Sequence, residues 1–209
     1  TIIIDAFLAI YKSTFILNTS SFINGEEGIN NYGLVAAMTF VMPKLKEIKP
    51  GLNSVFLVRY IIENYKTVSE GIEALNKLPI ASSCNILLTD RSGEMVVVEC
   101  NPLKIHIRNP EKNKNGESFI ITVNHFTSEE MWKHDASNRD AFSSETRYQT
   151  AYNALKNIDY RDGIEHAQNT LSGKYGFMCQ YDKNLNFDTI WSSVFDITNS
   201  RVFRAEGNP

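Results

Sequence analysis

The order of helical and strand-like segments predicts an α+β fold, in which helices and strands occupy separate layers. Residues 53–78 carry apolar side chains at helical spacing, and residues 85–126 read as a succession of strands. A second helical block covers residues 144–171, and a second strand block covers residues 177–205. Blocks of helices that alternate with blocks of strands are typical of layered α+β domains.

Capping residues mark the first helical block. Asn53 is the expected N-cap of a helix, because apolar residues recur behind it at helical spacing. The segment Thr67-Val68-Ser69-Glu70 forms a capping box, which begins a second helix that Pro79 ends. Upstream of this block, the short apolar run at residues 34–41 predicts a buried strand.

The remaining elements follow from local patterns in the sequence. The polar, glycine-containing segment Arg91-Ser92-Gly93 predicts a hairpin turn between two strands. Strands are expected at Asn85–Asp90, Glu94–Cys100, Ile105–Arg108, Phe119–Phe126, Phe177–Asp182, Thr189–Ile197 and Arg201–Ala205. Helices are expected from Ser144 to about Asn157 and from about Asp159 to Leu171.

Length and composition predict one globular domain, which we expect to span residues 1–209. The chain is long enough for a substantial core, and its 43% hydrophobic and 22% charged residues are ordinary for a soluble protein. A net charge of -3 gives no electrostatic case for nucleic acid, so no such partner is expected. No window approaches the ~20 apolar residues that a membrane-spanning helix requires.

The three cysteines, Cys84, Cys100 and Cys179, are widely spaced and form no C-x-x-C pair. This pattern argues against a disulfide framework or a zinc site and favours buried thiols in a reducing, cytoplasmic compartment. An N-terminal signal stays open, because we interpret the start of the chain as missing. The scattered histidines lack the spacing of metal ligands, so neither a metal nor another cofactor is expected.

Several motifs together resemble one enzyme superfamily. They are Thr122–Phe126, Ser143–Tyr148 and Thr189–Asp196, with Gly28–Phe40, Leu57–Tyr60 and Ser82–Asp90 upstream. In this order and spacing they resemble the linear amide C–N hydrolases, which include the choloylglycine hydrolases, penicillin V acylases and isopenicillin N acyltransferases. The resemblance extends from about Asn18 to the C-terminus. It implies an αββα sandwich, with two largely antiparallel sheets between helical layers.

The resemblance also implies a nucleophile that this chain does not contain. The superfamily attacks its amide with the thiol of an N-terminal cysteine, whose own α-amine accepts the proton. This chain begins Thr1-Ile2-Ile3, and the resemblance places the cysteine upstream of Thr1. We therefore interpret the chain as a truncated or processed piece that is inactive alone. Thr1 as an N-terminal nucleophile is a less favoured alternative.

The resemblance singles out Asn124, Arg147 and Thr39 as candidate catalytic residues. Asn124 matches the asparagine whose side chain donates to the oxyanion, although an asparagine at the end of a strand also suits a turn. Arg147 matches an arginine beside the nucleophile. A cation in the first turn of a helix is unfavourable for the helix dipole and needs a local partner, which Glu145 or Asp140 could equally supply.

Thr39 stands where the superfamily supplies a second oxyanion donor from a backbone N–H. Bile-salt hydrolases have asparagine there, so the segment Ala37-Met38-Thr39-Phe40 favours the acyltransferase-type branch. The predicted activity is hydrolysis of linear non-peptide amides through a cysteine thioester. Acyl transfer and a catalytically inactive binding module are the alternatives. The expected partner is a small-molecule amide substrate, and a homo-oligomer is possible on the same resemblance.

Overall fold

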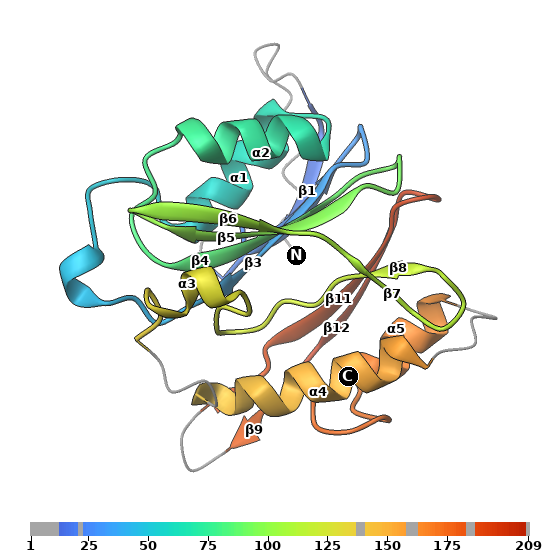
Figure 1. Cartoon of the computed structure of the whole chain (residues 1–209). Helices are drawn as coiled ribbons and strands as arrows, with labels where there is room; N and C mark the ends of the chain where they lie inside the picture. The colour runs from blue at the N-terminus through green and yellow to red at the C-terminus, as the bar shows by residue number, and fades with distance from the viewer. Residues whose placement is uncertain (1–12, 21–22, 137–140, 158–162, 183–186, 208–209) are drawn as a thin grey trace.

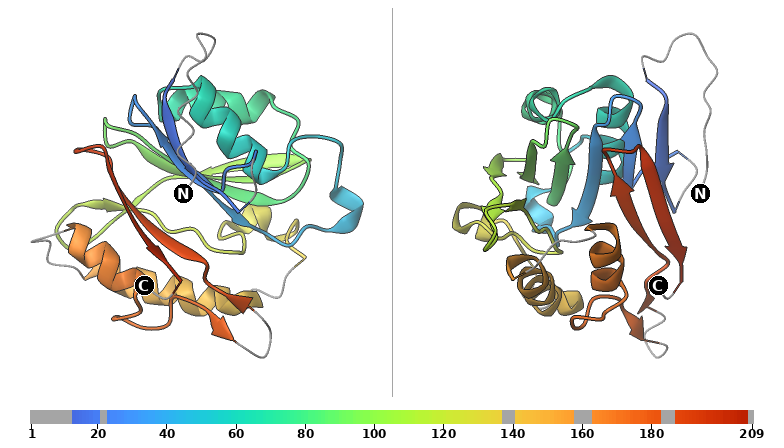
Figure 2. Two further views of the ribbon diagram at one scale, coloured as in Figure 1. Left: turned by 180° about the vertical axis from the view of Figure 1, so that it is seen from behind. Right: turned by 90° about the vertical axis from the view of Figure 1, so that its right-hand side faces the viewer.

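The computed structural model describes residues 13–20, 23–136, 141–157, 163–182 and 187–207. Helices α1 (Ser54–Asn64) and α2 (Val68–Lys77) cover one face of a large sheet, and a second layer of strands follows on the other side. Helices α4 (Ser144–Lys156) and α5 (Gly163–Leu171) form the outer layer beyond these strands (Figure 1). Figure 2 shows the same four layers from two further directions. The predicted αββα arrangement is confirmed.

The large sheet is a six-stranded antiparallel meander, in which every strand pairs with its neighbours in the sequence. Its strands are β1 (Phe15–Asn18), β2 (Glu27–Asn30), β3 (Val35–Phe40), β4 (Cys84–Thr89), β5 (Met95–Asn101) and β6 (Lys104–Arg108). The predicted hairpin turn joins β4 to β5, where Gly93 adopts a positive φ of 85° that favours glycine. In this sheet Thr39 lies opposite Asn85.

The helices α1 and α2 begin where their capping residues predict. The Asn53 side chain accepts a hydrogen bond from the N–H of Phe56, and the Thr67 side chain accepts one from the N–H of Glu70. Burial of apolar side chains then holds both helices on the sheet. The main core combines helix and strand residues, among them Leu57, Ile61, Leu75, Ile86, Leu88 and Val98.

The second layer of strands is the hairpin of β11 (Trp191–Asp196) and β12 (Arg201–Glu206). Shorter elements are η1 (Leu45–Glu47), β7 (Glu111–Lys112), β8 (Ser118–Phe119), α3 (Glu129–Trp132), η2 (Ala141–Ser143), β9 (Tyr181–Asp182) and β10 (Phe187–Asp188). The predicted start of a helix near Asp159, and Thr1, lie outside the described residues. Within the part of the chain that is described, every helix is too short or too polar to cross a membrane.

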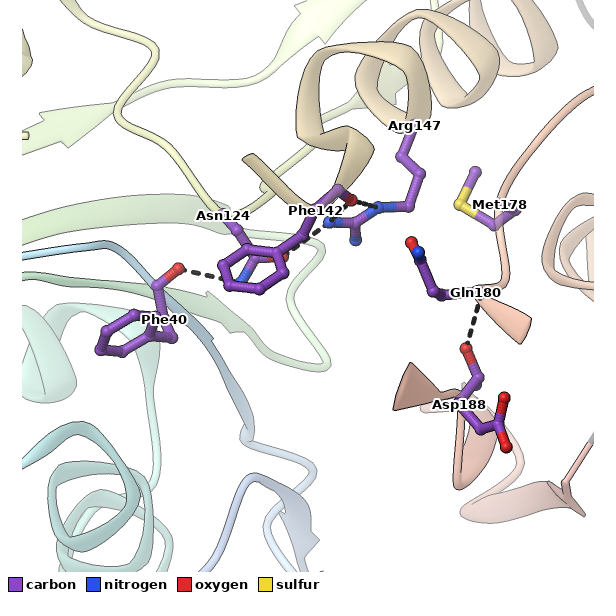
Figure 3. Close-up of a pocket in the computed structure, with 8 residues that line it drawn as sticks. Phe40, Asn124, Phe142, Arg147, Met178, Gln180 and Asp188 are labelled. Carbon is purple, nitrogen blue, oxygen red and sulfur yellow. Dashed lines mark hydrogen bonds between the residues drawn. The ribbon is translucent and has the colours of Figure 1, made fainter. Parts of the chain in front are cut away.

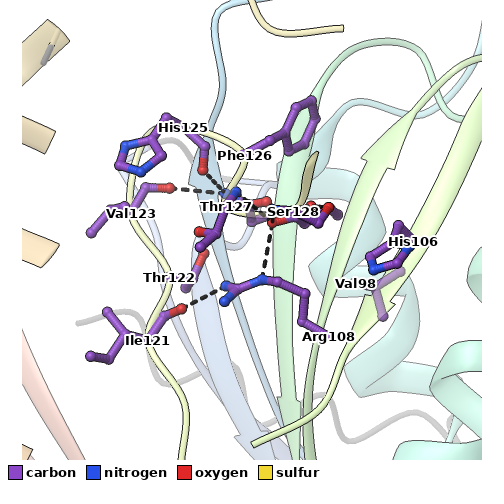
Figure 4. A network of polar contacts seen from close by, with 12 residues as sticks. Val98, His106, Arg108, Ile121, Thr122, Val123, His125, Phe126, Thr127 and Ser128 are labelled. Carbon is purple, nitrogen blue, oxygen red and sulfur yellow. Dashed lines mark hydrogen bonds and ion pairs between the residues drawn. The ribbon is translucent and has the colours of Figure 1, made fainter. Parts of the chain in front are cut away.

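The strand predicted at Phe119–Phe126 is wrong beyond Phe119, because residues 120–126 belong to no sheet. Side chains of the large sheet replace the missing strand partner. The carbonyl of Ile121 accepts from Arg108 Nη2 at 2.6 Å (Figure 4), and that of Val123 accepts from Thr39 Oγ1 at 2.7 Å. We name residues 121–125 the tethered segment. Likewise, the strand predicted at Phe177–Asp182 is confined to Tyr181–Asp182.

Candidate active site

The side-chain amide of Asn124 is held at both ends. Its Nδ2 donates to the carbonyl of Phe40 at 2.9 Å, and its Oδ1 accepts from Arg147 Nη2 at 2.8 Å (Figure 3). A guanidinium has no acceptor and a carbonyl has no donor, so the amide cannot be reversed between these partners. Nδ2 carries two protons, and Phe40 takes one of them. The amide can therefore offer its second N–H to a ligand in a fixed direction.

Arg147 lies in the first turn of α4 and contacts two oxygens. Besides Asn124, it donates to the carbonyl of Phe142 from Nε at 3.2 Å and from Nη2 at 3.1 Å. Burial is the main influence on the Arg147 guanidinium and lowers its pKa, although an arginine remains charged at neutral pH. No ion pair joins Arg147 to Glu145 within the described residues, and the other predicted partner, Asp140, lies outside them.

The turn before α4 is strained. Phe142 and Ser143 have φ angles of 59° and 51°, which is the left-handed region that side chains other than glycine rarely adopt. The two hydrogen bonds from Arg147 to the Phe142 carbonyl stabilise this turn. As a result, the ring of Phe142 faces the same cavity as Asn124. Strained backbone of this kind is enriched at functional sites.

The tethered segment is also fixed to α4 through Ser144, the first residue of that helix. The Ser144 hydroxyl accepts the backbone N–H of Asn124 at 2.9 Å and lies 2.9 Å from His125 Nδ1. Ser144 is 0% exposed and His125 is 1% exposed. The other ring nitrogen of His125, Nε2, lies 3.6 Å from a carboxylate oxygen of Glu145.

These residues surround a cavity of about 360 Å³, which falls within the size range of small-molecule sites. One wall comes from Phe40, Asn124, Phe142 and Arg147, and the facing wall comes from the chain near β9 and β10. The facing wall consists of Met178, Gln180, Asp188 and Thr189. The cavity thus combines aromatic and thioether surface with one guanidinium, one carboxylate and several neutral hydrogen-bonding groups.

Thr39 lies at the site but faces it differently from Asn124. Its hydroxyl donates to the Val123 carbonyl at 2.7 Å and lies 3.2 Å from the hydroxyl of Thr122. The neighbouring Met38 N–H donates to the carbonyl of Glu26 on the β2 side. Because hydrogen-bonding directions alternate along an antiparallel strand, the N–H of Thr39 points to the other side, toward β4. Thr39 therefore supports the tethered segment with its side chain.

The structure brings together Asn124 and Arg147, which the sequence singled out, with Thr39 behind them. Sequence reasoning missed Ser144 and the cavity residues Phe142, Met178, Gln180 and Asp188. Ser144 carried a detectable signal, since it opens the helix that bears Arg147 three residues later. On the facing wall, Thr189 begins one of the motifs found in the sequence, whereas Met178, Gln180 and Asp188 stand in none of them.

Among the residues that the structure describes, no three histidine, cysteine, aspartate or glutamate side chains gather closely enough to hold a metal ion. All three cysteines are free thiols, and Cys84 and Cys100 are buried opposite each other in β4 and β5. The thiol of Cys84, followed by burial, raises the pKa of Cys100 well above its ordinary value, so this buried thiol stays protonated.

A comparison with protein families identifies the family of this chain. Residues 7–209 match the family described as "Acyl-coenzyme A:6-aminopenicillanic acid acyl-transferase". The chain belongs to this family. It is therefore an enzyme of the linear amide C–N hydrolase superfamily, whose members are amide hydrolases and acyltransferases with an N-terminal-nucleophile fold. A search of curated proteins found no match.

Solved structures of low sequence identity share the fold. Penicillin V acylase from Agrobacterium tumefaciens is 19% identical with a TM-score of 0.59, and the match covers 94% of this chain and 67% of that one. A variant of conjugated bile acid hydrolase from Clostridium perfringens is 13% identical with a TM-score of 0.58, covering 94% and 74%. An N-acylethanolamine-hydrolyzing acid amidase ortholog from Caenorhabditis elegans is 12% identical with a TM-score of 0.54, covering 90% and 83%.

Proposed function

We propose that the protein hydrolyses linear, non-peptide amides of small molecules through a cysteine thioester, with the cysteine upstream of Thr1. The proposed site is the cavity beside Asn124. A carbonyl group placed there accepts the free N–H of the Asn124 amide, while apolar parts of the substrate contact Phe40, Phe142 and Met178. Since all three cysteines are free thiols, we propose a reducing, cytoplasmic location.

The proposed reaction proceeds in two steps. The cysteine sulfur attacks the amide carbon while the α-amine of the same residue takes the thiol proton, and the carbonyl oxygen becomes an oxyanion. The C–N bond then breaks, and the amine leaves with that proton, so a thioester remains. In the second step water attacks the thioester carbon, which releases the carboxylic acid and restores the thiol.

The fixed orientation of Asn124 is the observation that supports this proposal most strongly. An oxyanion is stabilised best by a donor that is already aimed at it and need not reorganise. Arg147 and Phe40 hold the two ends of the Asn124 amide, so the donor is in place before a substrate arrives. We propose that Arg147 acts on the reaction through this contact and through its charge.

The second proposed donor is the backbone N–H of Thr39. This N–H points toward Asn85 on β4 and is not aimed at the cavity, so the structure supports Asn124 as a donor more strongly than Thr39. The side chain of Thr39 already holds the Val123 carbonyl, which lies next to Asn124 in the chain. The side chain of Thr39 thus helps to fix the segment that carries the first donor.

Acyl transfer is the second candidate function. The family description names an acyl-transferase, and the segment Ala37-Met38-Thr39-Phe40 resembles that branch. In this version an amine, rather than water, attacks the thioester and carries the acyl group away as a new amide. A third candidate is a binding module of the same fold that lacks the nucleophile. The predicted homo-oligomer stays a prediction.

The decisive test begins with the intact mass and the N-terminal sequence of the protein as its source produces it. A chain that begins with cysteine upstream of Thr1 supports the thiol mechanism, and replacing that cysteine by alanine should abolish release of amine from a panel of N-acyl amides. A natural chain that begins at Thr1 contradicts it. Adding an amine acceptor then separates the two activities, since only an acyltransferase converts the acceptor into an amide at the expense of free acid.

A further inference from the structure

The first turn of α4 contacts Asn124 at two separate points. Ser144 accepts the backbone N–H of Asn124, and Arg147 donates to its side-chain Oδ1. Residues three apart in a helix lie on the same face, so one helical face holds both the main chain and the amide. The guanidinium fixes the orientation of the amide, whereas the hydroxyl fixes the position of the backbone that carries it.

The hydroxyl of Ser144 also joins this contact to His125. Because it accepts the Asn124 N–H, its own proton is available to His125 Nδ1, which lies 2.9 Å away. Both Ser144 and His125 are almost fully buried. Removing the hydroxyl leaves the Asn124 N–H and the imidazole nitrogen without this partner in a place where water cannot readily replace it.

We propose that Ser144 is a positioning residue, which holds the backbone of Asn124 so that the free amide N–H is aimed into the cavity. This inference rests on the proposed function, in which that N–H stabilises the oxyanion. Ser144 does not line the cavity and is 0% exposed, so we expect it to make no contact with a bound substrate. It acts only through Asn124, and in this it differs from Arg147, whose charge faces the cavity directly.

Ser83 provides a matched control. Like Ser144 it is 0% exposed, and its hydroxyl accepts from Asn101 Nδ2 at 3.1 Å and lies 3.4 Å from the carbonyl of His134. Neither Ser83 nor these partners line the cavity of Asn124. Loss of the Ser83 hydroxyl therefore costs stability by the same physical route, without loosening the proposed oxyanion donor.

The first measurement is backbone hydrogen exchange by NMR in the wild type, Ser144→Ala and Ser83→Ala proteins. We expect the Asn124 amide to exchange at least tenfold faster in Ser144→Ala, beyond any change shared by core amides such as that of Val97. In Ser83→Ala the exchange rate of the Asn124 amide should change only by as much as the exchange rates of the core amides change. An Asn124 amide that follows the core amides in Ser144→Ala as well would overturn the proposal.

A second variant covers the case in which Ser144→Ala does not fold. Ser144→Cys nearly preserves the side-chain volume but offers sulfur, a weak acceptor, to the Asn124 N–H. We expect the same selective loosening of Asn124, to a smaller extent. If the cysteine variant folds and protects Asn124 as well as the wild type does, the hydroxyl is not what holds it, and the proposal fails.

The kinetic measurement connects positioning to catalysis. With the N-acyl amide that the wild type cleaves best, we expect Ser144→Ala to lower kcat about tenfold and to change KM less than twofold, because a misplaced donor affects the transition state. Ser83→Ala should leave both unchanged. An unaltered kcat together with a loosened Asn124 would refute the positioning role. Absence of amide cleavage by the wild type would refute the proposed function instead, and the exchange result then decides the hydrogen-bonding role of Ser144 alone.

Discussion

The hydroxyl of Thr39 and the side-chain amide of Asn85 lie opposite each other on neighbouring strands and donate to the same oxygen, the carbonyl of Val123. Asn85 also donates to the carbonyl of His125 at 3.1 Å. The residue between these two carbonyls is Asn124. Two strands of the large sheet therefore fix the main chain on both sides of the proposed oxyanion donor.

We expect Asn85→Ala to destabilise the protein by about 3 kcal/mol, because two buried carbonyls lose a donor. It should also lower kcat for amide cleavage, since the tethered segment that carries Asn124 is released. Thermal unfolding and steady-state kinetics measure the two effects. Asn101→Ala is the control, because Asn101 is equally buried and bonds to Glu47 and Ser83 away from the cavity. A similar loss of activity in both variants would attribute the effect of Asn85→Ala to stability alone.

Asn124→Asp tests the donor with the smallest change of shape. The carboxylate keeps an acceptor for Arg147 but has no N–H for an oxyanion, and it places an oxygen against the Phe40 carbonyl. We expect kcat to fall by about a hundredfold or more, as on removal of an oxyanion donor elsewhere. Asn76→Asp, on the exposed side of α2, should leave kcat unchanged. An active Asn124→Asp enzyme would exclude Asn124 as the donor.

Arg147→Lys tests whether charge alone is sufficient. An ammonium is a compact charge that cannot reproduce the fork between Asn124 Oδ1 and the Phe142 carbonyl. We expect kcat to fall about tenfold and the strained turn at Phe142 to relax, which changes of chemical shift in residues 142–144 would report. Arg59→Lys is a suitable control, because Arg59 makes a similar pair of contacts with Glu63 and the carbonyl of Ile23. Full activity of Arg147→Lys would show that only the charge is needed.

The hydrogen bonds of Asp90 predict that part of the free energy of unfolding is lost in acid. Burial alone would raise the pKa of its carboxyl, but hydrogen bonds from the Ser92 hydroxyl and from the N–H groups of Val68 and Ser92 lower it below the ordinary value of 3.8. The ionised form therefore stabilises the fold above pH 3.8, and this contribution is lost as the pH falls through the lowered pKa.

Asp90→Asn should destabilise the protein by about 2 kcal/mol at pH 7, because an amide N–H replaces one acceptor. The difference between the free energies of unfolding of the two proteins should shrink below pH 3.8. Glu94→Gln, on the exposed side of the same turn, should change neither the free energy of unfolding at pH 7 nor its dependence on pH. If the difference between the free energies of unfolding of the two proteins stays constant down to pH 2, the hydrogen-bonded Asp90 carboxylate does not stabilise the fold through its ionised form.

Short sequence patterns correctly predicted the elements that contacts between nearby residues stabilise. Asn53 and Thr67 cap their helices as expected, and Gly93 closes the expected hairpin. The prediction of a strand at Phe119–Phe126 failed because its pattern is that of a strand, whereas its hydrogen-bonding partners are side chains from distant strands. Periodicity shows that a segment buries alternate side chains, but it does not show which groups donate hydrogen bonds to the carbonyls of that segment.

The candidate site likewise contains residues that motifs revealed and contacts that only the folded structure reveals. Asn124 and Arg147 were found because they stand in recognisable motifs, and their contact could not be foreseen from spacing. Ser144 stands in the motif Ser143–Tyr148 but was not singled out, because its bonds to Asn124 and His125 join segments that only the fold brings together. The facing wall near Met178 and Asp188 depends wholly on tertiary packing.

The contact between Asn124 and Phe40 joins residues that are 84 positions apart, whereas most strands of the large sheet follow their partners closely in the chain, β3 and β4 being separated by α1 and α2. Contacts between near neighbours close small loops and can form early, while distant contacts close large ones. The sheet with α1 and α2 is thus able to assemble before α4 docks. If the sheet forms first, the chain holds most of its core before Arg147 reaches Asn124, and we then expect the oriented donor to appear only when α4 docks.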